Sequence, residues 1–570
     1  MFLEPTEAWQ ILGLCTALVI AFLLAVHFTK LKMKVPLFYS WIGAIAIFGG
    51  ALAFLLPLAL NSGFGKDDDG RILRQLILYT TGGVLGVITL GESHRKNNQE
   101  KEKNENDHTR QVYAERRSRY TKAIEQLADE KAAVRLGGIY TLAGLVDEWL
   151  ADNSLQPYEQ RKEGQVIINN LCAYIRSPFP LALKAETLEA DSEPDNYEGD
   201  FSKDQATFHE EQDVRRAIFI EMSKRSSTLA RDKKGKVFDT FPGLWSDFDF
   251  NFSRASIFYP LSNLTIEKAF FSSCRFYGDA NFVNTVFTQN ANFWEATFTQ
   301  NVSFALATFT QNAEFTKATF VQNTDFIRVT FVQSATFCET IFTQKTNFAE
   351  ATFIQNANFW GTTFTQNANF RGTTFTQDAD FREAIFTQDA GFLRTTFGQS
   401  AGFTKATFTQ NANFLRTTFT QTAGFTKATF TQNANFQGAT FIQNADFAKA
   451  TFTQNANFWG AIFTQNANFL ETLFTQNAIF RRAVFAQNTN FHDAYFKNIE
   501  PTFALGNSGA LFSVLTDPSN YVFKVNFDST QSISTEQITV ADGQVFTIPV
   551  GCELFDPEPL PAPKPEEHTK

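Results

Sequence analysis

The chain has 570 residues, a net charge of −10 and 66 Phe residues, so it is long enough for two to four domains. Aromatic residues make up 15% of the chain and charged residues 19%, which excludes a disordered protein. The acidic balance argues against a protein that coats nucleic acid. The five Cys residues include no Cys-x-x-Cys pair, so neither a disulfide framework nor a zinc site is predicted.

Residues 1–91 are predicted to be a transmembrane region. Residues 9–28 and 37–60 are apolar stretches long enough to cross about 30 Å of hydrocarbon. A third span over residues 75–90 is shorter and contains a tyrosine and two threonines at positions 79–81. The predicted region therefore has two clear spans and a weaker third one.

The number of spans decides the side of the membrane on which the rest of the chain lies. The loop between the first two spans carries Lys30, Lys32 and Lys34, and such loops favour the cytoplasm. Three spans place the N-terminus outside and everything after residue 92 in the cytoplasm. With two spans, the large C-terminal part would lie outside instead.

The next two segments differ in pattern. Residues 92–118 are charged and rich in Asn, and they are predicted to form a charged linker or an exposed helix extension. In residues 119–230 apolar positions recur at steps of three and four, which predicts an α-helical module with helices at 164–175 and 212–223.

An acidic segment lies within this module. Residues 185–213 contain eleven Asp or Glu residues and one Lys, so they alone carry a charge of −10. We expect a solvated loop, and docking of a basic partner is the alternative.

Phe follows a strict rhythm further along the chain. Between Phe282 and Phe496 it recurs at alternating steps of five and six residues, which accounts for 40 of the 66 Phe residues. These steps fit neither a 3.6-residue helix nor a long strand, and they predict short extended segments separated by corners. Each Phe and the small residue two positions before it would point inward, and together they would fill a narrow tube.

The unit Ala-Asn-Phe-x-x, as in residues 291–295, resembles the pentapeptide-repeat proteins, in a Phe-rich variant with an eleven-residue double unit. The resemblance implies a mainly β fold, a right-handed quadrilateral β-helix with four sides per turn. Since every second side has six residues, four sides take 22 residues, and residues 282–498 would form about ten coils. The sixth residue follows an invariant Gln and is usually Asn, so we expect it to be the left-handed residue of a corner.

The regions beside the repeat are predicted from less regular patterns. Residues 245–281 would be a lead-in or cap of the β-helix, 499–556 a C-terminal β cap, and the Pro-rich residues 557–570 a disordered tail. The strands expected in the C-terminal cap are 522–527, 537–540 and 544–549, the last two joined by a turn. Residues 119–142 resemble a helical segment of bacterial members of the family, which implies a multi-pass protein of the bacterial inner membrane.

The sequence contains no catalytic motif, so the protein is predicted not to be an enzyme and to have no cofactor or metal. His492 beside Asp493 is expected to be surface decoration, and Cys338 is expected to be an ordinary surface thiol.

Function is therefore predicted to lie on the surface of the rod. The freely varying positions are the two residues after every second Phe, and a 22-residue coil divides them between two opposite faces. One face alternates Glu and Lys. The other is the candidate protein-binding strip, because Arg, Leu and Trp are typical of docking surfaces. It comprises Arg328, Arg371, Leu393, Arg394, Leu415, Arg416, Trp459, Arg481 and Arg482.

The predicted function is a non-enzymatic, membrane-anchored scaffold that presents a rigid cytoplasmic β-helix to an unknown cytoplasmic protein, with no nucleic acid partner and no assigned oligomeric state. The alternative is a membrane-embedded regulator or sensor whose transmembrane helices carry the activity. Two minor alternatives are a DNA-mimic topoisomerase inhibitor, which the resemblance suggests, and an ice-binding face built from Thr-x-Thr rows. Residues 280–496 contain 12 acidic and 12 basic residues, which disfavours a duplex mimic, and strand propensity accounts for the Thr rows.

Overall fold

The computed structural model describes residues 3–28, 37–62, 69–231, 237–541 and 543–557. The chain divides into two units, residues 1–118 and 119–570, and each is described by itself.

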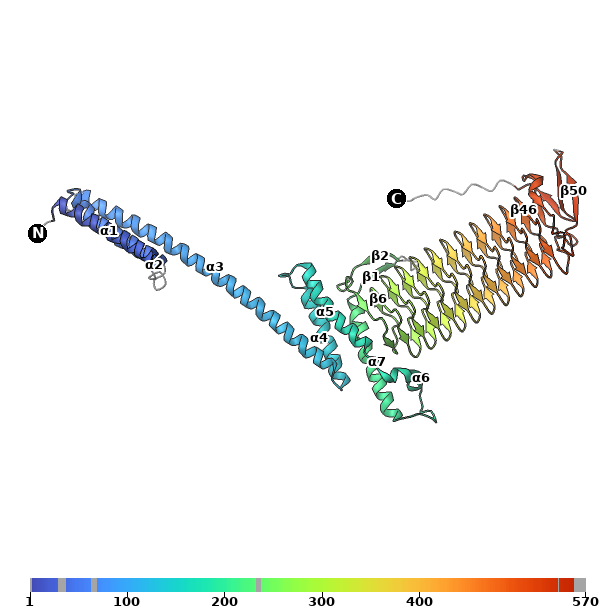
Figure 1. Ribbon diagram of the computed structural model, residues 1–570, viewed down its shortest axis with the longest axis horizontal. Helices are drawn as coiled ribbons and strands as arrows, with labels where there is room; N and C mark the ends of the chain where they lie inside the picture. The colour runs from blue at the N-terminus through green and yellow to red at the C-terminus, as the bar shows by residue number, and fades with distance from the viewer. Residues whose placement is uncertain (1–2, 29–36, 63–68, 232–236, 542, 558–570) are drawn as a thin grey trace. The chain divides into compact units, whose positions relative to one another are not determined.

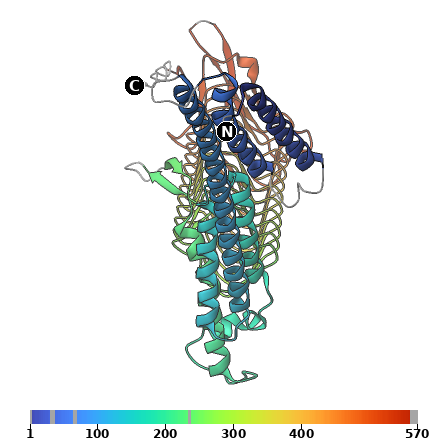
Figure 2. The same cartoon turned by 90° about the vertical axis from the view of Figure 1, so that its left-hand side faces the viewer.

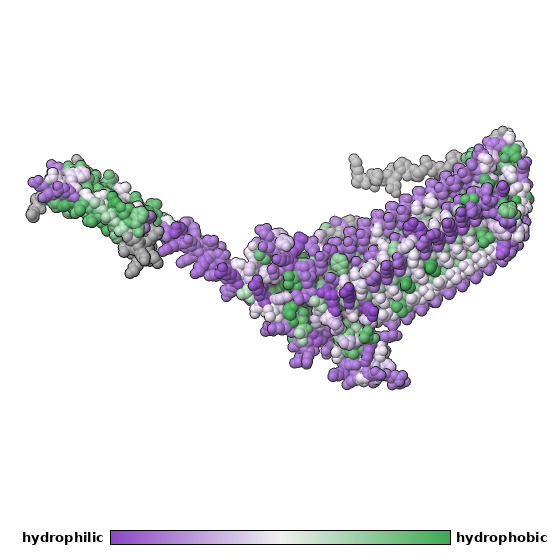
Figure 3. All heavy atoms as spheres, in the orientation of Figure 1, coloured by the Kyte–Doolittle hydropathy of each residue, from purple (hydrophilic) through white to green (hydrophobic). Residues whose placement is uncertain are grey.

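The first unit is helical. Helices α1 (Pro5–Phe28) and α2 (Leu37–Ala59) lie side by side, and α3 (Asp69–Leu127) follows (Figures 1 and 2). Three helices, including the start of α3, are long and apolar enough to cross a membrane. Figure 3 shows apolar residues over this bundle and a hydrophilic stretch of α3 after it. The lysines at positions 30, 32 and 34, which carry the orientation argument, lie outside the described residues.

The polar residues of the third span are accommodated within its own helix. The hydroxyls of Thr80, Thr81 and Thr89 each donate to the backbone carbonyl four residues earlier. A hydroxyl satisfied in this way loses little on entering hydrocarbon. Gly49 of α2 faces Thr81 so closely that a Cβ there would overlap its side chain, so the two helices pack tightly.

The segment predicted as a charged linker is helical. Residues 92–118 belong to α3, so the helix-extension alternative applies and the linker does not. The reason is composition: residues 92–127 contain no Gly or Pro and are rich in Glu, Lys, Arg and Gln, which favour helix even without a buried face.

The helical module of the second unit follows, and its elements are listed here: α4 (Ala132–Leu150), α5 (Pro157–Arg176), η2 (Pro180–Lys184), α6 (Ala185–Leu188) and α7 (Phe201–Lys224). The prediction of one solvated loop over 185–213 is wrong at both ends, since α6 and the start of α7 occupy it. Helix α7 begins eleven residues before the predicted helix because Asp200 caps it, accepting a hydrogen bond of 3.0 Å from the Lys203 backbone.

Strands β1 (Thr228–Arg231) and β2 (Val237–Phe241) form a short antiparallel pair, and most of the rest of the second unit is a parallel β-solenoid of about 11 turns (Figure 1). One coil contains β10 (Ala291–Asn292), β11 (Thr297–Phe298), β12 (Val302–Ser303) and β13 (Thr308–Phe309). Ala291 pairs with Ala313 of the next coil, so a coil has 22 residues. Each of the four strands belongs to a separate parallel sheet, and the sheets have 13, 12, 10 and 13 strands. The predicted four-sided β-helix is confirmed.

The interior of the solenoid is filled by the Phe ladder. All ladder Phe residues are at most 1% exposed, and each stacks on the Phe 22 residues away, as Phe293 does on Phe315 with ring centroids 4.9 Å apart. The small inward residues are Ala or Thr, except for Val at positions 302 and 329. Where Thr occurs, its hydroxyl is satisfied by a backbone carbonyl, as in the bond of 2.7 Å from Thr340 to Phe315. The predicted alternation of large and small inward residues is confirmed.

The corners of the coil are of two kinds. In the five-residue step, Ala296 donates to the Phe293 carbonyl at 3.0 Å, and the third turn residue, Glu295, has φ of 54°, which is the pattern of a type II turn. Positive φ recurs at every eleventh residue from Asn284 to Asp493. The left-handed residue was predicted at the Asn after each invariant Gln, and this prediction is wrong. These Asn side chains instead form ladders, as in the bonds of 3.0 Å from Asn455 to Asn433 and of 3.1 Å from Asn433 to Asn411.

Helices cover the N-terminal end of the solenoid. Phe219 of α7 packs on Phe252 and Phe271 of the first coils, at centroid distances of 4.6 and 6.4 Å. Residues 245–281 form coils themselves, beginning with β3 (Phe250–Asn251), so the cap consists of helices.

The C-terminal end continues the coils beyond residue 498, where the repeat was predicted to end. Strands β48 (Leu511–Ser513), β49 (Tyr521–Val522) and β52 (Glu553–Phe555) extend two of the sheets. Strands β50 (Thr535–Thr539) and β51 (Val545–Pro549) form the predicted hairpin. The strand predicted over 522–527 is reduced to β49. Most of the predicted tail, residues 558–570, lies outside the described residues.

Candidate interaction surface on the coil corners

Each coil has two type II turns on opposite sides of the rod. One joins β10 to β11 and its equivalents; we name it the Lys/Glu corner, after Glu295, Lys317, Glu339, Glu383, Lys405, Lys427, Lys449 and Glu471 at its left-handed position. The other joins β12 to β13 and its equivalents; we name it the Arg corner, after Arg328, Arg394, Arg416 and Arg482 at the same position.

The structure brings the nine residues of the predicted strip together in the Arg corner. They occupy two parallel columns, formed by the second and the third residue of successive turns. The backbone locks the columns in register, since Arg394 N donates to the Leu415 carbonyl at 3.0 Å and Gly372 N donates to the Leu393 carbonyl at 2.9 Å. Neighbouring coils lie about 4.8 Å apart, so side chains in one column are close neighbours.

The two columns differ in chemistry. Leu393, Leu415 and Trp459 are half-buried in the second-residue column. Arg394 and Arg416 are exposed in the third-residue column. Arg371 and Arg481 also lie in the second-residue column, so the strip combines apolar and cationic side chains on one amphipathic surface.

Some strip arginines are occupied by contacts within the rod. Arg328 forms an ion pair of 2.7 Å with Glu350, and Arg482 lies over the Trp459 ring at 5.7 Å. The other four arginines form no ion pair with any described residue. They are Arg371, Arg394, Arg416 and Arg481.

Three ion pairs partly neutralise the Lys/Glu corner along its own column. Lys317 pairs with Glu339 at 3.9 Å, Lys405 with Glu383 at 3.0 Å and Lys449 with Glu471 at 3.5 Å. Each pair joins neighbouring coils. At the same turn position, the Lys/Glu corner thus has three ion pairs, whereas the Arg corner has one, between Arg328 and Glu350, and the unmatched Arg394 and Arg416.

Two residues considered for chemistry are surface features of the Lys/Glu corner. Burial, with the nearby acids Glu314, Asp380 and Glu339, raises the pKa of Cys338 to about 11, which opposes a reactive thiolate. His492 Nδ1 and Asp493 lie 3.1 Å apart and are partly exposed. The described residues hold no group of three or more side chains that could bind a metal ion.

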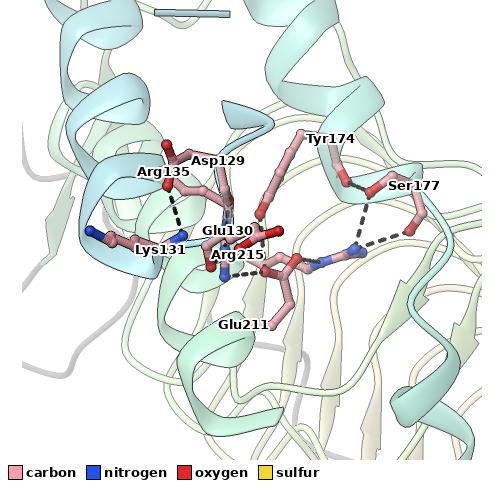
Figure 4. A network of polar contacts seen from close by, with 8 residues as sticks. All are labelled: Asp129, Glu130, Lys131, Arg135, Tyr174, Ser177, Glu211 and Arg215. Carbon is pink, nitrogen blue, oxygen red and sulfur yellow. Dashed lines mark hydrogen bonds and ion pairs between the residues drawn. The ribbon is translucent and has the colours of Figure 1, made fainter. Parts of the chain in front are cut away.

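The helical module contains a buried polar hub that sequence reasoning missed (Figure 4). Arg215 is 1% exposed and donates to Glu211 at 2.7 Å and to the Ile175 carbonyl at 2.8 Å. Arg135 and Tyr174 donate to the second oxygen of Glu211 at 3.1 and 3.0 Å. Glu211 belongs to the segment predicted as solvated, so part of that acidity is structural.

A second cluster connects the module to the first coils. Arg225 donates to Asp147 at 2.7 Å and to Glu221 at 2.6 Å, and Trp245 donates to Asp147 at 2.9 Å. Burial alone would raise the pKa of Glu221, but the hydrogen bonds from Lys224 and Arg225 outweigh it and lower the pKa. The first cluster holds the helices of the module together, the second connects them to the first coils, and neither includes a residue of the strip.

A shallow groove of about 740 Å³ crosses the first coils on the β12 sheet. It is lined by Asn, Ser and Thr together with Asp279, Asp325 and Lys345. Burial raises the pKa of Asp325 above its ordinary range. The lining is polar and shallow and contains no aromatic ring.

Some hydroxyls of the Thr rows donate hydrogen bonds within the rod. Thr343 and Thr387 donate to the backbone carbonyls of Phe320 and Phe364 in the preceding coil, at 3.1 and 3.0 Å. Hydroxyls used in this way do not form a free array for ice.

Comparison with protein families identifies the repeat. The family model for pentapeptide repeats (nine copies) matches residues 265–306, 339–385, 381–429 and 425–473. Searches of curated proteins and of solved structures returned no match. The matched segments lie within one continuous series of four-sided coils, so this part of the solenoid is built from pentapeptide repeats.

Proposed function

We propose that this protein is a membrane-anchored scaffold whose β-solenoid presents the Arg corner to a protein partner in the bacterial cytoplasm. The observation that carries the proposal is the inequality of the two corners. Both have the same turn, yet the arginines at 371, 394, 416 and 481 form no ion pair with a described acidic residue, whereas three Lys–Glu pairs join neighbouring coils at the opposite corner.

The membrane part of the proposal is supported by the three apolar helices. Attachment through these helices would confine the scaffold to the surface of the inner membrane. The orientation follows from three spans with the first loop in the cytoplasm. Protease accessibility of the C-terminus in spheroplasts and in inverted vesicles tests it, and digestion in spheroplasts would place the rod outside.

The scaffold is tested by capture in living cells. A photo-reactive amino acid at Gln437, in the second-residue column of the Arg corner, should cross-link a discrete protein, and R394E/R416E should abolish the cross-link. K405E/K427E makes the same charge change at the same turn position of the opposite corner and should leave the cross-link intact. Equal loss with both variants would contradict a corner-specific scaffold.

A second candidate is a regulator or sensor whose membrane helices carry the activity. Helix α3 favours it, because one uninterrupted helix contains both the third apolar segment and the first residues of the helical module. Deletion of residues 245–555 separates the two functions: the scaffold loses its phenotype, whereas the membrane regulator keeps it.

A further inference from the structure

The partner of the Arg corner has a definite shape requirement, which rests on the proposed function and goes beyond it. We infer that the strip binds an acidic amphipathic α-helix of the partner, with the helix axis along the axis of the rod.

The backbone of the Arg corner cannot accept an added strand. The corner backbone is already hydrogen-bonded from coil to coil, as in the bonds from Arg394 N to Leu415 O and from Gly438 N to Trp459 O at 3.0 and 2.9 Å. A partner therefore cannot extend a sheet here, and it must be recognised through side chains.

The charge of the Arg corner favours an anionic partner. From Arg371 to Arg482 the two columns of the Arg corner contain five arginines and no acidic residue. Arg394 and Arg416 occupy the same turn position in neighbouring coils about 4.8 Å apart, an arrangement of like charges that is unfavourable until an anion lies between them. The partner should therefore supply carboxylates.

The axial spacing of the arginines favours a helical partner. Arg371, in the second-residue column, and Arg394 and Arg416, in the third-residue column, belong to three consecutive coils, so these arginines advance by about 4.8 Å and about 9.6 Å along the rod. Carboxylates at positions i, i+3 and i+7 of a helix advance by about 4.5 Å and about 10.5 Å. Alternate residues of a β-strand advance by about 6.7 Å and fall out of step by the third coil. The axial spacing of these helix positions therefore matches the spacing of the coils, and the spacing of strand residues does not.

Apolar side chains lie beside the exposed arginines of the strip. Leu393 and Leu415 lie beside Arg394 and Arg416 and are half-buried, so they can complete their burial against one apolar stripe. A helix with Glu and Leu on adjoining stripes presents both chemistries at once. A phosphate backbone would satisfy the arginines and leave the leucines uncovered.

The experiment uses the full-length protein in detergent micelles and a fluorescent 18-residue helical peptide with Glu at i, i+3 and i+7 beside a Leu stripe. Fluorescence anisotropy should show binding that R394E/R416E weakens at least about tenfold. R394G/R416G should weaken it similarly, and it keeps the backbone unstrained because Gly already occupies this position at Gly372 and Gly438. K405E/K427E should change the affinity less than about twofold.

A permuted peptide of the same composition, with Glu distributed around the helix, is the matched probe. It should bind at least about tenfold more weakly, and circular dichroism should show equal helicity. Equal binding of both peptides, or equal loss with K405E/K427E, overturns the proposal. Binding of duplex DNA that is tighter than binding of the peptide and depends on Arg394 also overturns the proposal, because the strip would then be a phosphate-binding surface.

These outcomes are separable from the fate of the scaffold. If the peptide fails but the photo-reactive residue at 437 still captures a partner through a non-helical segment, the helix inference is wrong and the scaffold stands. If the peptide binds and the cellular cross-link is absent, the corner recognises acidic helices and the cellular role is wrong.

Discussion

The Lys/Glu corner and the Arg corner of the solenoid have the same turn, with φ between 52° and 60° at the non-glycine third residue, and the same hydrogen bond from coil to coil. They differ only in the side chains attached to that backbone. On one side, Lys and Glu of neighbouring coils neutralise each other, as Lys405 and Glu383 do at 3.0 Å. On the other side, Arg394 and Arg416 are stacked without an acid.

The stability of this fold depends little on which charges the two corners carry. The Phe interior and the turns set the shape, and both corners need them equally. Surface ion pairs add little to stability, so the unneutralised corner costs the fold little. A charge pattern that stability does not require is the place to look for binding.

The largest expected effect tests whether the two corners share one interior. Phe403 opens a Lys/Glu turn and Phe392 opens an Arg turn, and both are completely buried with stacked neighbours 4.7 to 4.9 Å away. F403A and F392A should each cost about 3–5 kcal/mol of local stability because each leaves a cavity. Hydrogen exchange of the coil amides measures it, and a large difference between the two would break the equivalence.

The next effect concerns the thiol of the Lys/Glu corner. Cys338 has its pKa raised from 9.0 to about 11 by burial and nearby acids, so the thiolate is scarce at pH 8. Alkylation of Cys338 should be roughly 10- to 100-fold slower in the folded protein than after denaturation. Mass spectrometry of the labelled peptide follows the rate, and it should accelerate as the pH rises toward 11. Fast alkylation at pH 7 would show that the corner is not shielded.

A smaller effect tests the shared left-handed turn. K405V and R394V should each destabilise their coil by about 1–2 kcal/mol, because a β-branched residue fits positive φ poorly. K405G and R394G are the matched controls and should be neutral or slightly stabilising, since they relieve the strain. Local hydrogen exchange again reports the change. If valine is tolerated at either site, the turns are not equivalent.

The smallest effect is a change in stability that should have opposite signs at the two corners. E383Q removes the partner of Lys405 and should cost about 0.2–0.5 kcal/mol at low salt. R394Q relieves repulsion with Arg416 and should be neutral or stabilising by a few tenths of a kcal/mol. Both changes should vanish near 1 M salt. The same sign for both would mean that the Arg corner has an internal counter-charge.

Much of the architecture could be predicted from the sequence because the repeat is local and periodic. The Phe steps predict short segments and corners, and the 22-residue coil correctly groups Arg328 through Arg482 on one side. The left-handed position was missed because Asn was given more weight than Gly. Gly361, Gly372, Gly438 and Gly460 share the eleven-residue register of the turn and were the available signal.

What could not be predicted depends on contacts distant in sequence. Arg215 is buried among α5, α7 and the first coils, and nothing in its neighbours indicates that Glu211 and Ser177 will meet it. The helical state of residues 92–118 was likewise left open, since a polar helix without a buried face has no apolar period. The periodic sequence was enough to predict the solenoid, whereas the helical cap depends on packing between distant residues.

The eleven-residue Phe period inside a 22-residue coil has a consequence for how such a chain can change. Insertion of 22 residues lengthens the rod and leaves every downstream side chain on its own side. Insertion of eleven residues keeps the Phe interior intact, because the inward pattern repeats at that interval, but turns the downstream sequence by half a coil. The Arg positions after the insertion would then continue the opposite corner. A single duplicated unit could thus cut the binding column in two while leaving the fold unharmed.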